Sequence, residues 1–145
     1  MRLIRSLALA LALACALAPR AADAATTFRL DLGADYWMTE SGVFDLTLEI
    51  ETFVARHLGV GGRFGLALVT SPSTMAIPLD LVIAGEFSRF YVEGLVGPWI
   101  VFQGSAFRAH AALGVGLRTR SLSVGLEAGW LDPEAIVGVR LAFPL

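Results

Sequence analysis

The chain has 145 residues, enough for one domain and not for two. It contains no lysine, and its Asp and Glu residues outnumber its Arg residues, which excludes the basic surface that a nucleic-acid partner requires. Its one cysteine, Cys15, excludes a disulfide framework.

The first 24 residues have the features of a secretory signal peptide. Arg2 and Arg5 form a short basic region, residues 7–17 are an apolar run, and residues 22–24 supply a small-x-small cleavage pattern. The apolar run is shorter than the about 20 residues that a spanning helix needs. We therefore predict export, with a signal peptide at 1–24 and one domain at 25–145. The alternatives are a retained anchor or lipid attachment at Cys15, although the residues before Cys15 match a lipoprotein signal poorly.

The rest of the chain alternates between apolar and polar residues with period two, interrupted by turn residues, which is typical of antiparallel strands. Most of the alternating segments are longer than the about 5–6 residues usual in soluble proteins and match the roughly 9–11 that cross a membrane at a tilt. We predict eight strands, at residues 28–38, 43–54, 58–69, 77–87, 90–102, 107–119, 122–131 and 136–143.

The predicted connections alternate in length along the chain. Those at 39–42, 70–76, 103–106 and 132–135 are longer than those at 55–57, 88–89 and 120–121. Such alternation predicts an up-and-down barrel with loops at one rim and tight turns at the other. Acidic residues lie in the longer connections, and Arg56, Arg89 and Arg120 lie in the shorter ones.

The charged residues within the predicted strands all share one phase of the alternation. The opposite phase is almost wholly apolar, as Phe44, Leu46 and Leu48 show in the second strand. We therefore predict an all-β fold, an eight-stranded antiparallel up-and-down transmembrane barrel with its charges facing inward. The predicted interior charge network is Arg29, Asp31, Asp35, Asp45, Glu49, Glu51, Arg63, Asp80, Glu86, Glu93, Arg108, His110, Arg118, Glu127 and Arg140.

A soluble, lipocalin-like barrel that binds an apolar ligand would show the same alternation with the faces exchanged. The charged phase is rich in glycine, including Gly33, Gly114 and Gly138. Glycine weakens a solvent-facing strand, whereas inside a narrow barrel it leaves room for long side chains. This favours the membrane barrel, with the soluble barrel as the alternative.

Folding each strand back about its turn predicts which charges meet. Glu127 lies opposite Arg140 and Glu49 lies near Arg63. A third group contains Glu86, Tyr91, Glu93 and Arg118. The expected interior is a filled, ion-paired core, because a buried charge is costly unless it is paired. A narrow conduit or an acidic cation site on the first two strands is the functional alternative, although no pattern indicates a metal loop or a cofactor.

An outer-membrane lipid-modifying enzyme, an acyl hydrolase or transferase, is the weakest interpretation of the sequence. His110 is predicted to face inward opposite Trp99, with Ser105 nearby, but no carboxylate is obviously placed to orient its imidazole. A histidine stacked on Trp99 inside the barrel is the simpler explanation. Residues 97–99, Gly-Pro-Trp, indicate a bulge or kink, because proline is disfavoured inside a sheet. We expect no catalytic site.

The whole region from residue 25 resembles the small eight-stranded outer-membrane barrels of the outer-membrane-protein-A and W type. The most specific part is residues 137–145, with alternate apolar residues and a late aromatic, Phe143. It resembles the C-terminal signal that barrel-assembly machinery recognises, but ends in Pro144 and Leu145. The resemblance implies an outer-membrane location with lipid contacts, assembly through the last strand, and tight turns facing the periplasm. We expect a monomer with a structural or very narrow channel role.

Overall fold

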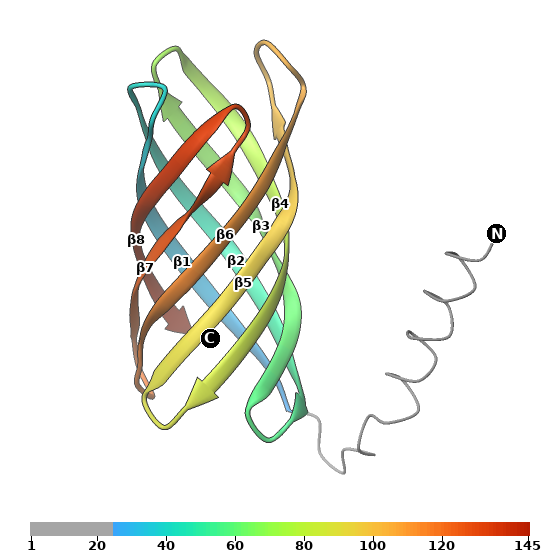
Figure 1. Cartoon of the computed structure of the whole chain (residues 1–145). Helices are drawn as coiled ribbons and strands as arrows, with labels where there is room; N and C mark the ends of the chain where they lie inside the picture. Colours follow the sequence, from blue (N-terminus) through green and yellow to red (C-terminus); the bar gives the residue numbers. More distant parts are fainter. Residues whose placement is uncertain (1–24) are drawn as a thin grey trace, which may run out of the picture.

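The computed structural model describes residues 25–145, which form a closed barrel of eight antiparallel strands (Figure 1). The predicted signal peptide, residues 1–24, lies outside the described residues. The strands contain between 9 and 15 residues, long enough to cross a membrane at a tilt. They are β1 Thr26–Trp37, β2 Ser41–Ala55, β3 Leu58–Thr70, β4 Ser73–Phe87, β5 Phe90–Val101, β6 Phe107–Arg118, β7 Ser123–Leu131 and β8 Glu134–Pro144. The predicted fold class is confirmed.

Each strand pairs with the next along the chain, and β1 pairs with β8 to close the barrel. Because the strands alternate in direction and are even in number, residues 25 and 145 lie at the same end (Figure 1). We call this end the basal rim; it also carries the connections at 56–57, 88–89 and 119–122. The connections at 38–40, 71–72, 102–106 and 132–133 form the distal rim.

The predicted alternation of long and short connections is wrong. β4 begins at Ser73, four residues before the predicted start, so the third connection shrinks to residues 71–72. Thr74 and Met75 pair with Val69 and Leu68 of β3. Strand pairing uses backbone groups, so polar residues such as Ser73 and Thr74 can extend a ladder that the hydropathy pattern does not reveal. The connection at 119–122 is longer than the predicted one at 120–121, because β6 ends one residue earlier and β7 begins one residue later.

The bulge predicted at residues 97–99 is also wrong. Gly97, Pro98 and Trp99 pair with β6 in unbroken register. Pro98 and Pro78 lie on neighbouring strands and coincide with gaps in the ladders, as expected for residues without an N–H donor. Among the described residues, a shift in strand register lies instead between Phe53 and Ala55, at the basal end of β2.

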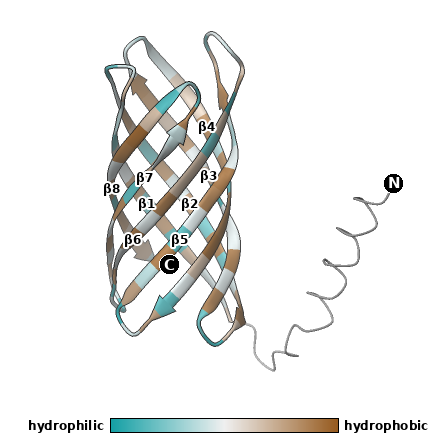
Figure 2. Ribbon diagram, viewed as in Figure 1, coloured by the Kyte–Doolittle hydropathy of each residue, from teal (hydrophilic) through white to brown (hydrophobic). Residues whose placement is uncertain are grey.

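The two faces of the barrel wall differ in chemistry. Hydrophobic and hydrophilic residues alternate along the strands in Figure 2. Large apolar side chains point outward and are exposed on every strand, as in Leu81 and Leu113, each 67% exposed. Inward positions carry the charged side chains, several glycines and a smaller set of buried apolar residues. Within residues 25–145, no helix of the length and apolarity needed to cross a bilayer is present.

Candidate functional site

The candidate site is the polar interior of the barrel, where all fifteen residues of the predicted charge network face inward. Glu86, Arg108 and Arg118 are half-buried because they lie near the rims. The other members of the network are buried: Arg29, Asp31, Asp35, Asp45, Glu49, Glu51, Arg63, Asp80, Glu93, His110, Glu127 and Arg140.

Glu127 of β7 is held by two guanidinium groups. Arg63 of β3 reaches across the interior and donates to both carboxylate oxygens, at 2.9 and 3.2 Å. Arg140 of the neighbouring β8 also donates two hydrogen bonds, each at 3.1 Å. Bidentate, charge-assisted hydrogen bonds of this kind fix geometry as well as charge. They therefore tie β3, β7 and β8 together through the centre of the barrel.

Arg140 also connects the centre to the first two strands. It donates to Asp35 of β1 at 3.0 Å and to Asp45 of β2. Its guanidinium occupies the space beside Gly33, since a Cβ added there would lie 1.3 Å from Arg140 Nη1. Gly138 is close to Asp35 in the same way. At these positions the absence of a side chain makes room for the ion pairs.

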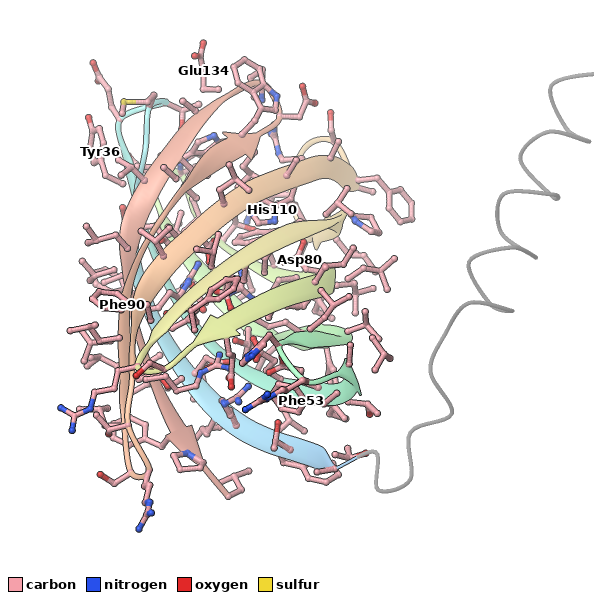
Figure 3. The ribbon with its side chains drawn as sticks, turned by 60° about the horizontal axis from the view of Figure 1, so that its bottom comes forward. Tyr36, Phe53, Asp80, Phe90, His110 and Glu134 are labelled. Atoms are coloured by element: carbon pink, nitrogen blue, oxygen red, sulfur yellow. The ribbon has the colours of Figure 1, made fainter. Side chains whose placement is uncertain are left out.

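His110 of β6 and Asp80 of β4 form a buried pair that spans the intervening strand (Figure 3). The distance from His110 Nδ1 to Asp80 Oδ1 is 2.8 Å. The other carboxylate oxygen of Asp80 accepts a hydrogen bond of 3.4 Å from Trp99 Nε1 and lies 3.8 Å from Arg63. The sequence-based expectation that no carboxylate orients His110 is therefore wrong. We call Asp35, Asp45, Arg63, Asp80, His110, Glu127 and Arg140 the central cluster.

A second group of charges, the basal cluster, lies nearer the chain ends. It consists of Arg29, Glu49, Glu51, Glu86 and Arg118. Arg29 pairs with Glu49 at 2.9 Å and with Glu51, and it lies 3.6 Å from Glu86. Arg118 pairs with Glu86, lies 3.4 Å from Glu51, and is 4.6 Å from the centre of the Tyr91 ring. Two guanidinium groups thus share three carboxylates.

Between the two clusters lies an internal cavity of about 10 Å³, the room that a single water molecule needs. Asp31 and Glu93 line it and form no ion pair among the described residues. One oxygen of Asp31 is buried without a hydrogen-bond partner. The interior is therefore almost completely filled by side chains at this level.

The distal end of the interior is apolar. Arg108 lies beyond it, 5.0 Å from the centre of the Trp37 ring, and donates to the carbonyl of Asp132. Trp37 Nε1 donates to the carbonyl of Leu131 at 2.8 Å. These contacts lie at the distal opening. We call the buried inward side chains here the distal layer: Trp37, Val43, Ala67, Val69, Ala76, Trp99, Val101, Leu131 and Ile136.

The predicted pairings differ in part from the structure. Glu49 and Arg63 are direct partners in the strand register, yet their side chains pair with other residues. Arg140 lies opposite Gly125, two residues from the predicted register, although it still reaches Glu127. In the third group, Arg118 contacts Glu86 and Tyr91, whereas Glu93 forms no ion pair in the described region.

His110 and Trp99 are in contact, but their rings are tilted by 53° and 5.2 Å apart, so they are not stacked in parallel. Trp99 lies opposite Arg108 in the register, and His110 lies opposite Gly97.

The geometry does not assemble a catalytic triad. Ser105 lies in the exposed 102–106 connection, whereas the imidazole of His110 is fully buried. No hydrogen bond joins the two in the described part of the chain. Within residues 25–145, no group of three His, Cys, Asp or Glu side chains is arranged to hold a metal ion. Of the acidic residues of β1 and β2, Asp35 and Asp45 pair with Arg140, and Glu49 and Glu51 pair with the basal arginines.

The closed eight-stranded barrel is similar in fold to solved structures. The chain has the fold of transmembrane β-barrels. Two similar structures are designed proteins. One is a de novo transmembrane β-barrel, with a TM-score of 0.65 and 14% identity, and the match covers 82% of this chain and 95% of that one. The other is the de novo designed TMB2.3, with a TM-score of 0.56 and 10% identity, and the match covers 86% of this chain and 98% of that one. A natural one is the N-terminal β-barrel domain of Pseudomonas aeruginosa OprF (0.51, 10%, 85% and 100%). No protein-family description matches the chain, and no curated protein is significantly similar in sequence.

Proposed function

We propose that this protein is an integral outer-membrane β-barrel whose ion-paired interior serves a structural role and does not conduct. The observation that carries the proposal is the belt of large apolar side chains that project outward on all eight strands. A transmembrane barrel exposes such a belt to lipid and keeps its polar residues inside. Outer-membrane lipid is therefore the proposed partner of this surface.

The ends of the belt support the same proposal. Exposed aromatic side chains lie near both rims: Tyr36, Phe44, Phe102, Phe107 and Trp130 toward the distal rim, and Phe28, Phe87, Phe90 and Phe143 toward the basal rim. Aromatic girdles at the two membrane–water interfaces are a general feature of membrane barrels.

Two features of the interior support a structural role over a channel. The central and basal clusters cross-link strands that are not neighbours, and the cavity between them holds no more than one water molecule. The distal layer closes the other end with apolar side chains. A continuous aqueous path would require side chains of this interior to move or to be removed.

The soluble alternative receives less support. A lipocalin-like barrel needs an apolar internal cavity for its ligand. A hollow of about 800 Å³ instead lies on the outer wall, where Leu81, Val96, Leu113 and Trp130 surround the small residues Gly94 and Ala111. In the proposed membrane location, acyl chains would fill it.

Extraction of washed membranes with alkaline carbonate tests the location. An integral barrel stays in the pellet, and heating should shift its migration on a detergent gel, as for other closed barrels. Release into the carbonate supernatant, together with a detergent-free monomer, would support the soluble barrel instead.

Recordings in planar bilayers test the absence of conduction. Folded protein that gives no current steps supports the structural role. Reproducible current steps would establish the narrow-channel alternative.

Export, assembly and oligomeric state are further parts of the proposal. We propose cleavage after Ala24, which N-terminal sequencing of protein from the membrane fraction tests. We also propose that β8, through Val137, Val139, Leu141 and Phe143, engages the barrel-assembly machinery. Because the belt needs only lipid around it, the proposed state is a monomer, and its mass in detergent can be measured by light scattering.

A further inference from the structure

A cavity of about 710 Å³ opens the interior at the basal rim. Four arginines contribute to its wall, Arg29, Arg89, Arg118 and Arg120, together with Phe53 and Phe90. Phe53 lies near the basal end of β2 and Phe90 begins β5 at the same rim; Figure 3 shows the two at different sides of the barrel. The volume falls within the roughly 300–1,000 Å³ typical of ligand pockets.

Glu86 is the only carboxylate among the residues that line this cavity. Its contacts show how arginines of the wall bind a negatively charged oxygen group. Its side chain is 28% exposed, and it lies between two guanidinium groups, paired with Arg118 and 3.6 Å from Arg29. These two deep arginines are therefore already neutralised by the carboxylates of the basal cluster.

Arg89 and Arg120 are different. Both are exposed, and neither forms an ion pair with any residue in 25–145. The backbone N–H of Arg118 donates to the carbonyl of Arg89 at 2.7 Å. This bond holds the 88–89 turn against the end of β6, two residues before Arg120. Two arginines from adjacent connections, neither in an ion pair within residues 25–145, therefore line one cavity.

We propose that the basal cavity binds a phosphate group, with Arg89 and Arg120 as its principal ligands. Planar guanidinium groups donate bidentate hydrogen bonds that match the oxygens of phosphate. Phe53 of β2 and Phe90 of β5 each add apolar surface to the wall, which suits a phosphate ester with an apolar portion. The phosphate can come from a dissolved ester or from the headgroup of a neighbouring phospholipid.

The test uses the folded barrel in a neutral, phosphate-free detergent. The amide NMR signals of Ser88, Arg89 and Arg120 are followed during titration with inorganic phosphate at constant ionic strength, which separates site binding from screening. A saturable shift is expected, and Arg89→Gln or Arg120→Gln should each weaken it by about tenfold. The matched control is Arg56→Gln, an exposed arginine of the same rim that does not line the cavity.

A second arm replaces inorganic phosphate with phosphatidylglycerol mixed into the micelles. Saturation by inorganic phosphate supports a dissolved ligand, and saturation by the lipid alone supports a headgroup. Either result must depend on Arg89 and Arg120. The proposal is overturned if neither probe saturates, or if Arg56→Gln weakens binding as much as the other two variants. Heat-modifiable gel migration verifies that each variant is folded.

Discussion

Arg63 and Glu127 meet across the barrel, from β3 and β7, through two hydrogen bonds of 2.9 and 3.2 Å. No strand ladder joins β3 to β7 directly, so this pair and its neighbours connect parts of the wall that are not adjacent in the sheet. The interior therefore acts as a polar core, in which charge pairing takes the place that apolar packing has in soluble proteins.

Removing the carboxylate at the centre of this core should be severe. Glu127→Gln leaves Arg63 and Arg140 without their shared partner in a buried setting, and we expect a loss of about 3–5 kcal/mol in unfolding free energy. Denaturant titration of the barrel in lipid vesicles measures it. Glu40→Gln, at an exposed distal position, should change stability by about 0.5 kcal/mol or less. Equal losses of unfolding free energy in the two variants would show that Glu127 does not stabilise the ion-paired interior.

The lipid contact of the outward belt can be tested by placing an arginine at two different membrane depths on one strand. Leu113→Arg, near the middle of the outer face of β6, should cost about 2–4 kcal/mol in a bilayer, whereas Leu117→Arg, nearer the basal rim, should cost about 0–1 kcal/mol. Both leucines are exposed, 67% and 49%, so loss of packing is similar in the two variants. Unfolding from vesicles gives the comparison. Two small and equal losses would argue for a water-exposed wall.

Glycine inside the barrel should be irreplaceable where a guanidinium fills its space. Gly33→Ala puts a methyl group where Arg140 Nη1 lies, and we expect about 1–3 kcal/mol of destabilisation from overpacking. Gly62→Ala is the control, since its added Cβ meets only the carbonyl of Asp80 at 3.5 Å. If the two variants are equally stable, the Arg140 side chain has moved aside without loss.

The distal layer should be the barrier to ions. Trp99→Ala removes its largest fully buried side chain and should lower stability by about 3–5 kcal/mol while admitting small ions. Ion leakage from loaded vesicles measures the permeability. Trp130→Ala removes an outward tryptophan, 49% exposed, and should leave the vesicles tight. A Trp99→Ala barrel that folds and does not leak would place the barrier elsewhere, in the ion-paired clusters.

The sequence was sufficient to predict the strand number, the antiparallel order and the closed barrel. Alternation carried this information, because each strand has one apolar face and one charged face, as in Leu46 and Leu48 against Asp45 and Glu49. It failed at the beginning of β4, where Ser73 and Thr74 join the ladder through their backbone alone.

The partners inside the barrel were harder to predict. Folding each hairpin back on itself considers only neighbouring strands, so it can identify Glu127 and Arg140. It cannot identify the pair of Asp80 and His110, because β5 lies between their two strands. It also cannot identify the pair of Arg63 and Glu127, which meets across the interior. Such contacts depend on the stagger at which the barrel closes, and one sequence does not encode that stagger in a readable pattern.

The shortness of the distal connections has a practical consequence. Residues 71–72 and 132–133 are tight turns directly between strands. Both rims therefore offer few extended segments that a protease could cleave or an antibody could bind. The connection at 102–106 is the exception, because all five of its residues are exposed. An epitope inserted there would report on which side of the membrane the distal rim lies, with the least disturbance to the strands.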